Sequence, residues 1–406
     1  MYHVTQTSWF HVSCSSCCHV LYVLIVFVSF DMYRPSHDPW TFQPYDRNTA
    51  EGRRAGTPLC GVGRKKHFAF PFVIRGDLDW VDKTLKLADC HTKDHPCSWC
   101  GCNETTRPWR DFRRLGAWSA SIFSDASWRA ERPRNPRPGC KLFALEFISI
   151  LAVCPDWMHN MHLGIMQYVY GSVLWLLTHQ LLNEGSPTLN VQKVMADLRL
   201  FWRRHPTPGH YQGIGLSMFG SSDSDTRDSY PRLKGTAGEI KRLTKGLHSV
   251  FITYRFSDKP ANPAKYIAHK QIGLMISKFG ELDDILDQHP AHMYPRLPAA
   301  SADAFTTLAF ESMGLLTAVA NYYISTELLQ LFNATIKCHM MLHGATNARF
   351  MNPRLAICYG GEDYMHHMKR VVGASIRGTN VGAISGKMTS KIRSAMHLEM
   401  LPRHRL

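Results

Sequence analysis

The amino-acid sequence predicts an α/β fold that contains a large all-helical segment. Residues 142–153 (LFALEFISILAV) are rich in β-branched and aromatic side chains and have the length of a buried strand. Residues 159–185 follow, and there apolar side chains recur at helical spacing until Gly185. Helical periodicity then continues through most of the chain up to residue 343. A strand followed by long helices is the pattern on which we base the fold class.

The first 66 residues are expected to be poorly organised apart from one apolar run, Cys18–Phe30 (CHVLYVLIVFVSF). This run is shorter than the roughly 20 apolar residues that span a bilayer. It also lacks the basic region and the small-residue cleavage site of a signal peptide. We therefore expect a buried strand or a loosely structured appendage, and no membrane association.

A second strand-like run, AFPFVIRGDLDW, ends in two acidic residues, Asp77 and Asp79. Carboxylates at the carboxyl end of a buried strand are candidates for a ligand site. Aspartate is also common in turns and at solvent-exposed strand ends. The local pattern leaves both interpretations open.

Cys97 and Cys100 form a C-x-x-C pair, the spacing that lets two thiolates reach one tetrahedral zinc ion. No second pair follows at zinc-finger spacing, so the remaining ligands are either close rivals or distant residues. The rivals are Cys90, His91, His95 and Cys102, and the distant candidates are Cys154, His159 and His162. We predict a small Cys/His zinc element resembling a zinc knuckle.

The next segment interleaves arginines with tryptophans. Its members are Arg107, Arg110, Arg113, Arg114, Arg129, Arg132, Arg134 and Arg137, with Trp109, Trp118 and Trp128. Arginines contact phosphates and indole rings stack on exposed bases, so the segment is a candidate nucleic-acid surface. A solvated basic loop with its tryptophans packed inward is an equally good interpretation of this composition.

The stretch Cys154–Gly164 (CPDWMHNMHLG) lies where the predicted strand meets the helix. Asp156 and His159 are three residues apart and share a face of the first helical turn, and His162 lies near that face. One interpretation makes Asp156 a helix N-cap with surface histidines beside it. The other places carboxylate and imidazole in a common site.

The rest of the chain is predicted to be mostly helical, with helices near residues 190–205, 236–256, 264–288 and 302–343. Glu362 then follows two glycines and opens a further helix, where an acid is favourable in the first turn. The tail beyond Gly373 is basic.

Composition supports a globular protein with an anionic partner. The chain has 406 residues, of which 45% are hydrophobic, and a net charge of +15. That excess favours nucleic acid first and an anionic membrane surface second. The 12 cysteines form no regular framework, which indicates reduced thiols and a possible metal site.

Three blocks together resemble the transposases of CACTA-type (En/Spm, tnp2-like) DNA transposons, including related sequences of dinoflagellate genomes. They are GDLDWVDKTLKLADCHTKDHPCSWC, CPDWMHNMHLGIMQYV and FMNPRLAICYGGEDYMHHMKRV. The resemblance implies an RNase H-like core interrupted by a helical bundle. Residues 67–165 would form part of that core, 166–343 the helical insertion and 344–375 its last helix, with 376–406 a basic tail.

The resemblance also implies metal-dependent cleavage and transfer of DNA strands in the nucleus. Asp77 and Glu362 would be two of three acids holding Mg²⁺ or Mn²⁺, with Asp156 and His159 beside them. Two such ions activate the attacking oxygen and stabilise the leaving oxygen. The protein would bind DNA, and a homo-oligomer is a candidate assembly for it.

The first of the three acids has no match in its family context, and only Asp31 ends a comparable apolar run. This predicts an amino-terminal truncation and an incomplete catalytic site. The alternative function is therefore a zinc-stabilised nucleic-acid-binding protein without catalysis.

Overall fold

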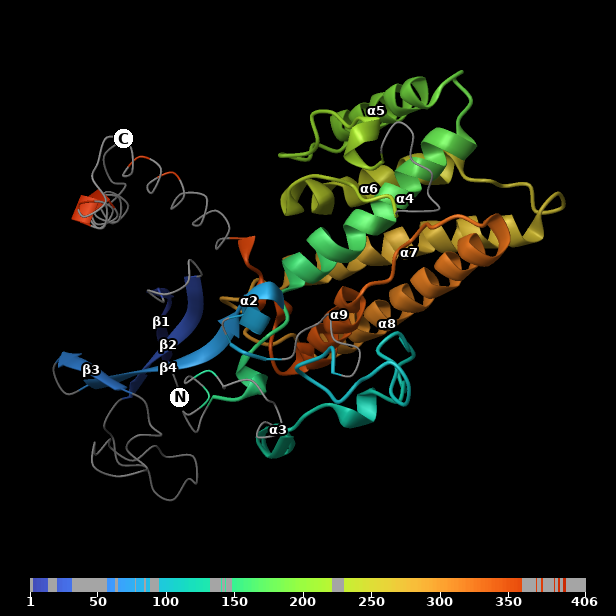
Figure 1. The fold of residues 1–406 in the computed structure, drawn as a ribbon. Coiled ribbons are helices and arrows are strands. Elements are labelled where there is room, and N and C mark those ends of the chain that lie inside the picture. The colour runs from blue at the N-terminus through green and yellow to red at the C-terminus, as the bar shows by residue number, and fades with distance from the viewer. Residues whose placement is uncertain are drawn as a thin grey trace. The chain divides into compact units, whose positions relative to one another are not determined.

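A computed structural model shows two compact units, residues 1–357 and 358–406. It describes residues 3–13, 20–30, 57–62, 65–76, 78–83, 85–87, 95–131, 140, 143, 148–220 and 230–359, with single positions between 370 and 391 in the second unit. Figure 1 shows the elements of the first unit, on which the functional site depends.

Four strands before residue 76 form an antiparallel sheet. They are β1 (His3–Ser13), β2 (Val20–Phe30), β3 (Thr57–Val62) and β4 (Lys65–Arg75), in the order β1-β2-β4-β3. The β2–β4 register shifts where Pro71 lies opposite Ile25. Proline cannot donate a ladder hydrogen bond, so an irregularity at this position is expected.

The predicted α/β RNase H-like core is wrong. After Arg75 the described residues contain helices, turns and isolated bridges, but no strand. Where residues 142–153 were expected to form a strand, the described part contains only the short 3₁₀ helix Ile150–Ala152 and one parallel bridge between Val153 and Ile74. The described part of this run lies beside β4 but joins it through a single bridge and not through a ladder, because strand propensity depends on tertiary context.

The helical part begins with two short helices, α2 (Leu78–Lys83) and α3 (Asp125–Glu131). A long buried helical stretch follows, made of the π-helix η5 (Met158–Met166), α4 (Gln167–Leu176) and the π-helix η6 (Leu177–Leu181). Nearly all of its side chains are buried, as expected for a helix that is apolar on every side.

Four long helices follow this stretch in the chain. Ser186 caps α5 (Pro187–Arg204), Thr236 and Glu239 form a capping box on α6 (Ala237–Tyr254), and Asn262 caps α7 (Pro263–Gln288). The fourth is α8 (Ala299–Tyr322), which continues into the π-helix η8 (Tyr323–Glu327). Figure 1 shows α7 and α8 running side by side. No helix in the described part is long and apolar enough to cross a bilayer.

The helix predicted over residues 302–343 is interrupted. Leu328 has a left-handed backbone and ends η8, and α9 (Ile336–Thr346) begins only after Thr335. Two 3₁₀ turns, η9 (Asn347–Arg349) and η10 (Pro353–Ala356), then close the unit. Because of this break, α9 is a separate helix, and it packs against η5 and α8.

Gly164 in η5 allows α9 to approach closely. A Cβ atom at this position would lie 2.6 Å from Cδ of Lys337 and 2.9 Å from the carbonyl oxygen of His159. At Gly164 the Lys337 side chain of α9 therefore packs directly against the backbone of η5.

Candidate metal centre

Cys97 and Cys100 lie in a turn that backbone hydrogen bonds fix in place. The amide of Trp99 donates to Sγ of Cys97 at 3.3 Å. Cys100 pairs with Ile122 in an antiparallel bridge, and Phe123 N–H donates to the Trp99 carbonyl at 3.0 Å. The two thiols are therefore presented on one side of an ordered turn.

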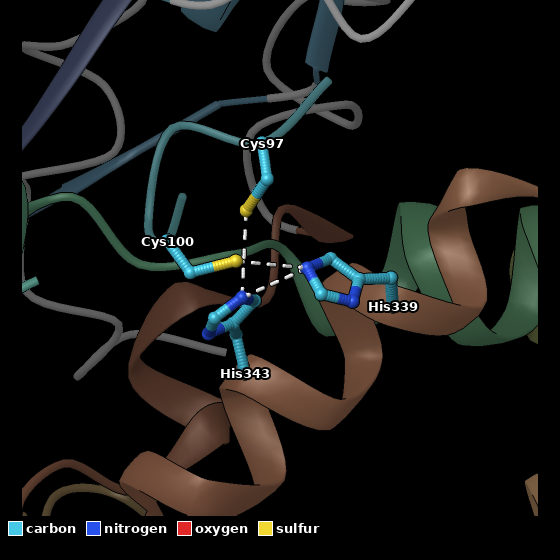
Figure 2. A group of neighbouring side chains, drawn as sticks. All are labelled: Cys97, Cys100, His339 and His343. Carbon is cyan, nitrogen blue, oxygen red and sulfur yellow. Dashed lines mark hydrogen bonds between the residues drawn. The ribbon is translucent and has the colours of Figure 1, made fainter. Parts of the chain in front are cut away.

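Two histidines of α9 face this turn. His339 and His343 are four residues apart, so both project from one face of the helix. Nε2 of His343 lies 3.4 Å from Sγ of Cys97, and Nε2 of His339 lies 3.3 Å from Sγ of Cys100. The two Nε2 atoms are 3.1 Å apart. Figure 2 shows the four side chains converging on one point.

The spacing of these atoms suits zinc. Ligands on one tetrahedral zinc ion lie ~3.3–3.8 Å apart when zinc–nitrogen and zinc–sulfur distances are about 2.1 and 2.3 Å. All four ligand atoms lie within 4.8 Å of one another, and no member of the set is more than 3% exposed. Four protein ligands around one centre leave no position for water, which is the arrangement of a structural site.

Tryptophan rings enclose the centre. The fully buried ring of Trp118 packs edge-on against both histidines, with centroids 4.5 Å from His339 and 5.1 Å from His343. Its Nε1–H donates to the Asp111 carbonyl at 2.7 Å, and Nε1–H of Trp99 donates to the Val153 carbonyl at 2.7 Å. These contacts exclude water and fix the indoles that hold the ligands in place.

The protonation states of the thiols are strongly perturbed. Burial raises the pKa of the Cys97 thiol well above its usual value. Hydrogen bonds from Cys102, from Cys97 and from both histidines lower the pKa of Cys100, which favours its thiolate. Burial lowers the pKa of His339 and keeps its imidazole neutral. A thiolate beside a neutral imidazole is the form that binds a metal ion.

Cys102 is a third buried thiol at this centre. The neighbouring Cys100 and burial raise the pKa of Cys102, which keeps its thiol protonated. Of the other nearby candidates, His95 is exposed, while Cys90 and His91 lie outside the described residues.

The structure brings the two predicted cysteines together with His339 and His343 and not with His159 or His162. The Cys154 thiol is buried against Leu355 and Ala356. His162 is hydrogen-bonded to Asp283 of α7 through Nε2 at 3.0 Å. The sequence contained a signal for the true partners, since His339 and His343 have the H-x₃-H spacing of zinc-finger ligands.

Asp156 contacts both the start of η5 and the ring of His159. Its buried carboxylate accepts a hydrogen bond from the Met158 amide at 3.0 Å, as a helix cap does, and also contacts Nδ1 of His159. The His159 ring is partly exposed. Asp77 and Glu362, the other predicted catalytic residues, lie outside the described residues.

The arginine segment, residues 107–137, has its tryptophans turned inward. Trp109, Trp118 and Trp128 are all buried and do not present stacking faces. Arg107, Arg110, Arg113 and Arg114 are exposed. Arg129 is half-buried and donates to Asp125 at 2.9 Å.

No family model, no curated protein and no solved structure matches this chain.

Proposed function

We propose that this protein is a zinc-stabilised nucleic-acid-binding protein of the nucleus, descended from CACTA-type transposases. The observation that carries the proposal is the closed Cys₂His₂ centre of Cys97, Cys100, His339 and His343. Zinc has the borderline softness and tetrahedral preference that two thiolates and two imidazoles satisfy.

The metal would connect two distant parts of the chain. Cys97 and Cys100 lie in the turn that directly precedes the exposed arginines in the sequence. His339 and His343 lie in α9, within the helical body. Segment 101–117 has no regular helix or paired strand of its own. Zinc would therefore hold the arginine segment in a defined position on the helices.

The exposed arginines support contact with nucleic acid. Arg107, Arg110, Arg113 and Arg114 lie within eight consecutive positions of a chain whose net charge is +15. Such a cluster neutralises phosphates and releases counterions, which gives affinity without sequence preference. The inward tryptophans act by fixing the loop and not by stacking on bases.

The test combines metal analysis with DNA binding. The double variant Cys97→Ser, Cys100→Ser should lose the bound zinc and bind duplex DNA more weakly at low salt. Cys338→Ala is the matched control, because Cys338 is a buried thiol next to a ligand in sequence but outside the cluster. Equal zinc content in the double variant and the wild type would contradict the proposal.

A second candidate is DNA strand cleavage dependent on Mg²⁺ or Mn²⁺. The buried Asp156 carboxylate beside the partly exposed His159 ring favours it, because a carboxylate–imidazole pair can hold or move a proton at a phosphodiester. Cleavage would also require Asp77 and Glu362 to join this pair.

A further inference from the structure

An open groove lies between the arginine segment and α8. Its volume is about 760 Å³, within the range of about 300–1,000 Å³ that is common for ligand sites. Residues 110–114 form one wall. The other wall consists of Thr307, Phe310, Glu311, Gly314, Thr317 and Ala318, which recur at three- and four-residue intervals and so share one face of α8.

The inner surface of this groove is apolar and aromatic. Phe112 is buried beneath it, and the half-buried Phe310 lines it. The Phe310 ring is stacked on Trp118 with an interplanar angle of 10° and a centroid distance of 6.4 Å. Because Trp118 contacts both histidines of the metal centre, the metal supports the surface on which a ligand would rest.

The charges around the groove favour an anion. The carboxylate of Asp111 is paired with Arg113 at 2.7 Å, and that of Glu311 is paired with Lys278 at 2.6 Å. Arg110 and Arg114 have no carboxylate partner among the described residues, and the Arg110 guanidinium lies 4.6 Å from the centroid of the Trp109 ring. Both acids are thus neutralised, while two guanidinium groups remain available.

We propose that this groove binds an unpaired base of single-stranded nucleic acid, with the base against Phe310 and the flanking phosphates at Arg110 and Arg114. An aromatic side chain beside cationic groups is the arrangement that receives unstacked bases. A base inside a duplex has both faces covered and cannot enter. The proposal rests on the proposed nucleic-acid binding and adds the form of nucleic acid that this surface recognises.

Gly314 provides a variant that blocks the groove without disturbing the fold. A Cβ atom there would meet no atom within 4 Å. Glycine is also the poorest helix former after proline, so leucine should not weaken α8. Ala304→Leu is the matched control, since Ala304 is an exposed position of α8 that does not line the groove.

The experiment measures the affinity of the zinc-loaded full chain for a short thymidine oligonucleotide and for an abasic oligonucleotide of equal length. Stacking of one base should favour the thymidine strand at least about five-fold. Gly314→Leu should abolish that preference, and Ala304→Leu should retain it, with both variants keeping the wild-type circular dichroism spectrum.

Two results would overturn the proposal that the groove binds an unpaired base. One is equal affinity of the wild type for the thymidine and abasic strands, and the other is a preference that Gly314→Leu retains. In both cases phosphate-driven binding, and with it the proposed function, would stand. Absence of binding to either strand and to duplex DNA at low salt would refute the proposed function itself.

Discussion

Removal of the metal should destabilise the protein substantially, because the centre closes a very long loop. Cys100 and His339 are 239 positions apart. Applied to a loop of that length, the chain-entropy relation for a cross-link gives about 5–6 kcal/mol at 25 °C. With an unfolding entropy of about 2.1 cal/mol/K per residue, this corresponds for 406 residues to a fall in melting temperature of roughly 6 °C.

Thermal unfolding followed by far-UV circular dichroism measures this effect, with the zinc-loaded protein compared before and after chelation. His339→Ala should melt near the chelated wild type and should no longer respond to chelator. Cys338→Ala should keep the full response, because it leaves all four ligands in place.

A chelation shift below about 1 °C would refute the reasoning, since it corresponds to only about 1 kcal/mol. If zinc also binds the unfolded chain, the change in melting temperature on chelation becomes smaller, and it becomes smaller still as the affinity of the unfolded chain for zinc rises. Titration with zinc separates the two cases, because a native site that matters for stability raises the melting temperature with increasing metal concentration.

Two further predictions concern groups outside the zinc centre. The pKa of the buried Asp283 carboxyl is lowered, against the opposing effect of burial, by the charge and hydrogen bond of His162 and by the charge of Lys241. A lowered folded pKa contributes stability that is present above the usual aspartate pKa of about 3.9 and is lost as the pH falls through the folded value. Asp283→Asn should therefore lower the free energy of unfolding in urea by about 3 kcal/mol at neutral pH. Below pH ~4 the stability of this variant should change less with pH than that of the wild type. Parallel pH profiles of the two proteins would contradict this. If the second candidate function holds, the protein should nick supercoiled DNA in the presence of Mg²⁺ or Mn²⁺, and Asp156→Asn should abolish this nicking. Nicking that survives in this variant would exclude Asp156 from the reaction.

The sequence by itself determined the helices and half of the metal centre. Helical periodicity and capping residues such as Thr236 with Glu239 are local signals, and the predicted helices over 190–205, 236–256 and 264–288 correspond to α5, α6 and α7. The Cys97-x-x-Cys100 pair is equally local, because its spacing alone allows two thiolates to reach one ion.

Only the tertiary structure decided which residues complete the centre. His339 lies in α9, and its distance from Cys100 in space depends on the packing of α9 against η5, which the absence of a side chain at Gly164 permits. The tertiary structure also decided that Trp118 faces the metal centre and not the solvent. The tertiary structure likewise decided that Ile150–Ala152, inside the run expected to be a strand, forms a 3₁₀ helix next to β4, because strand formation depends on context more than on composition.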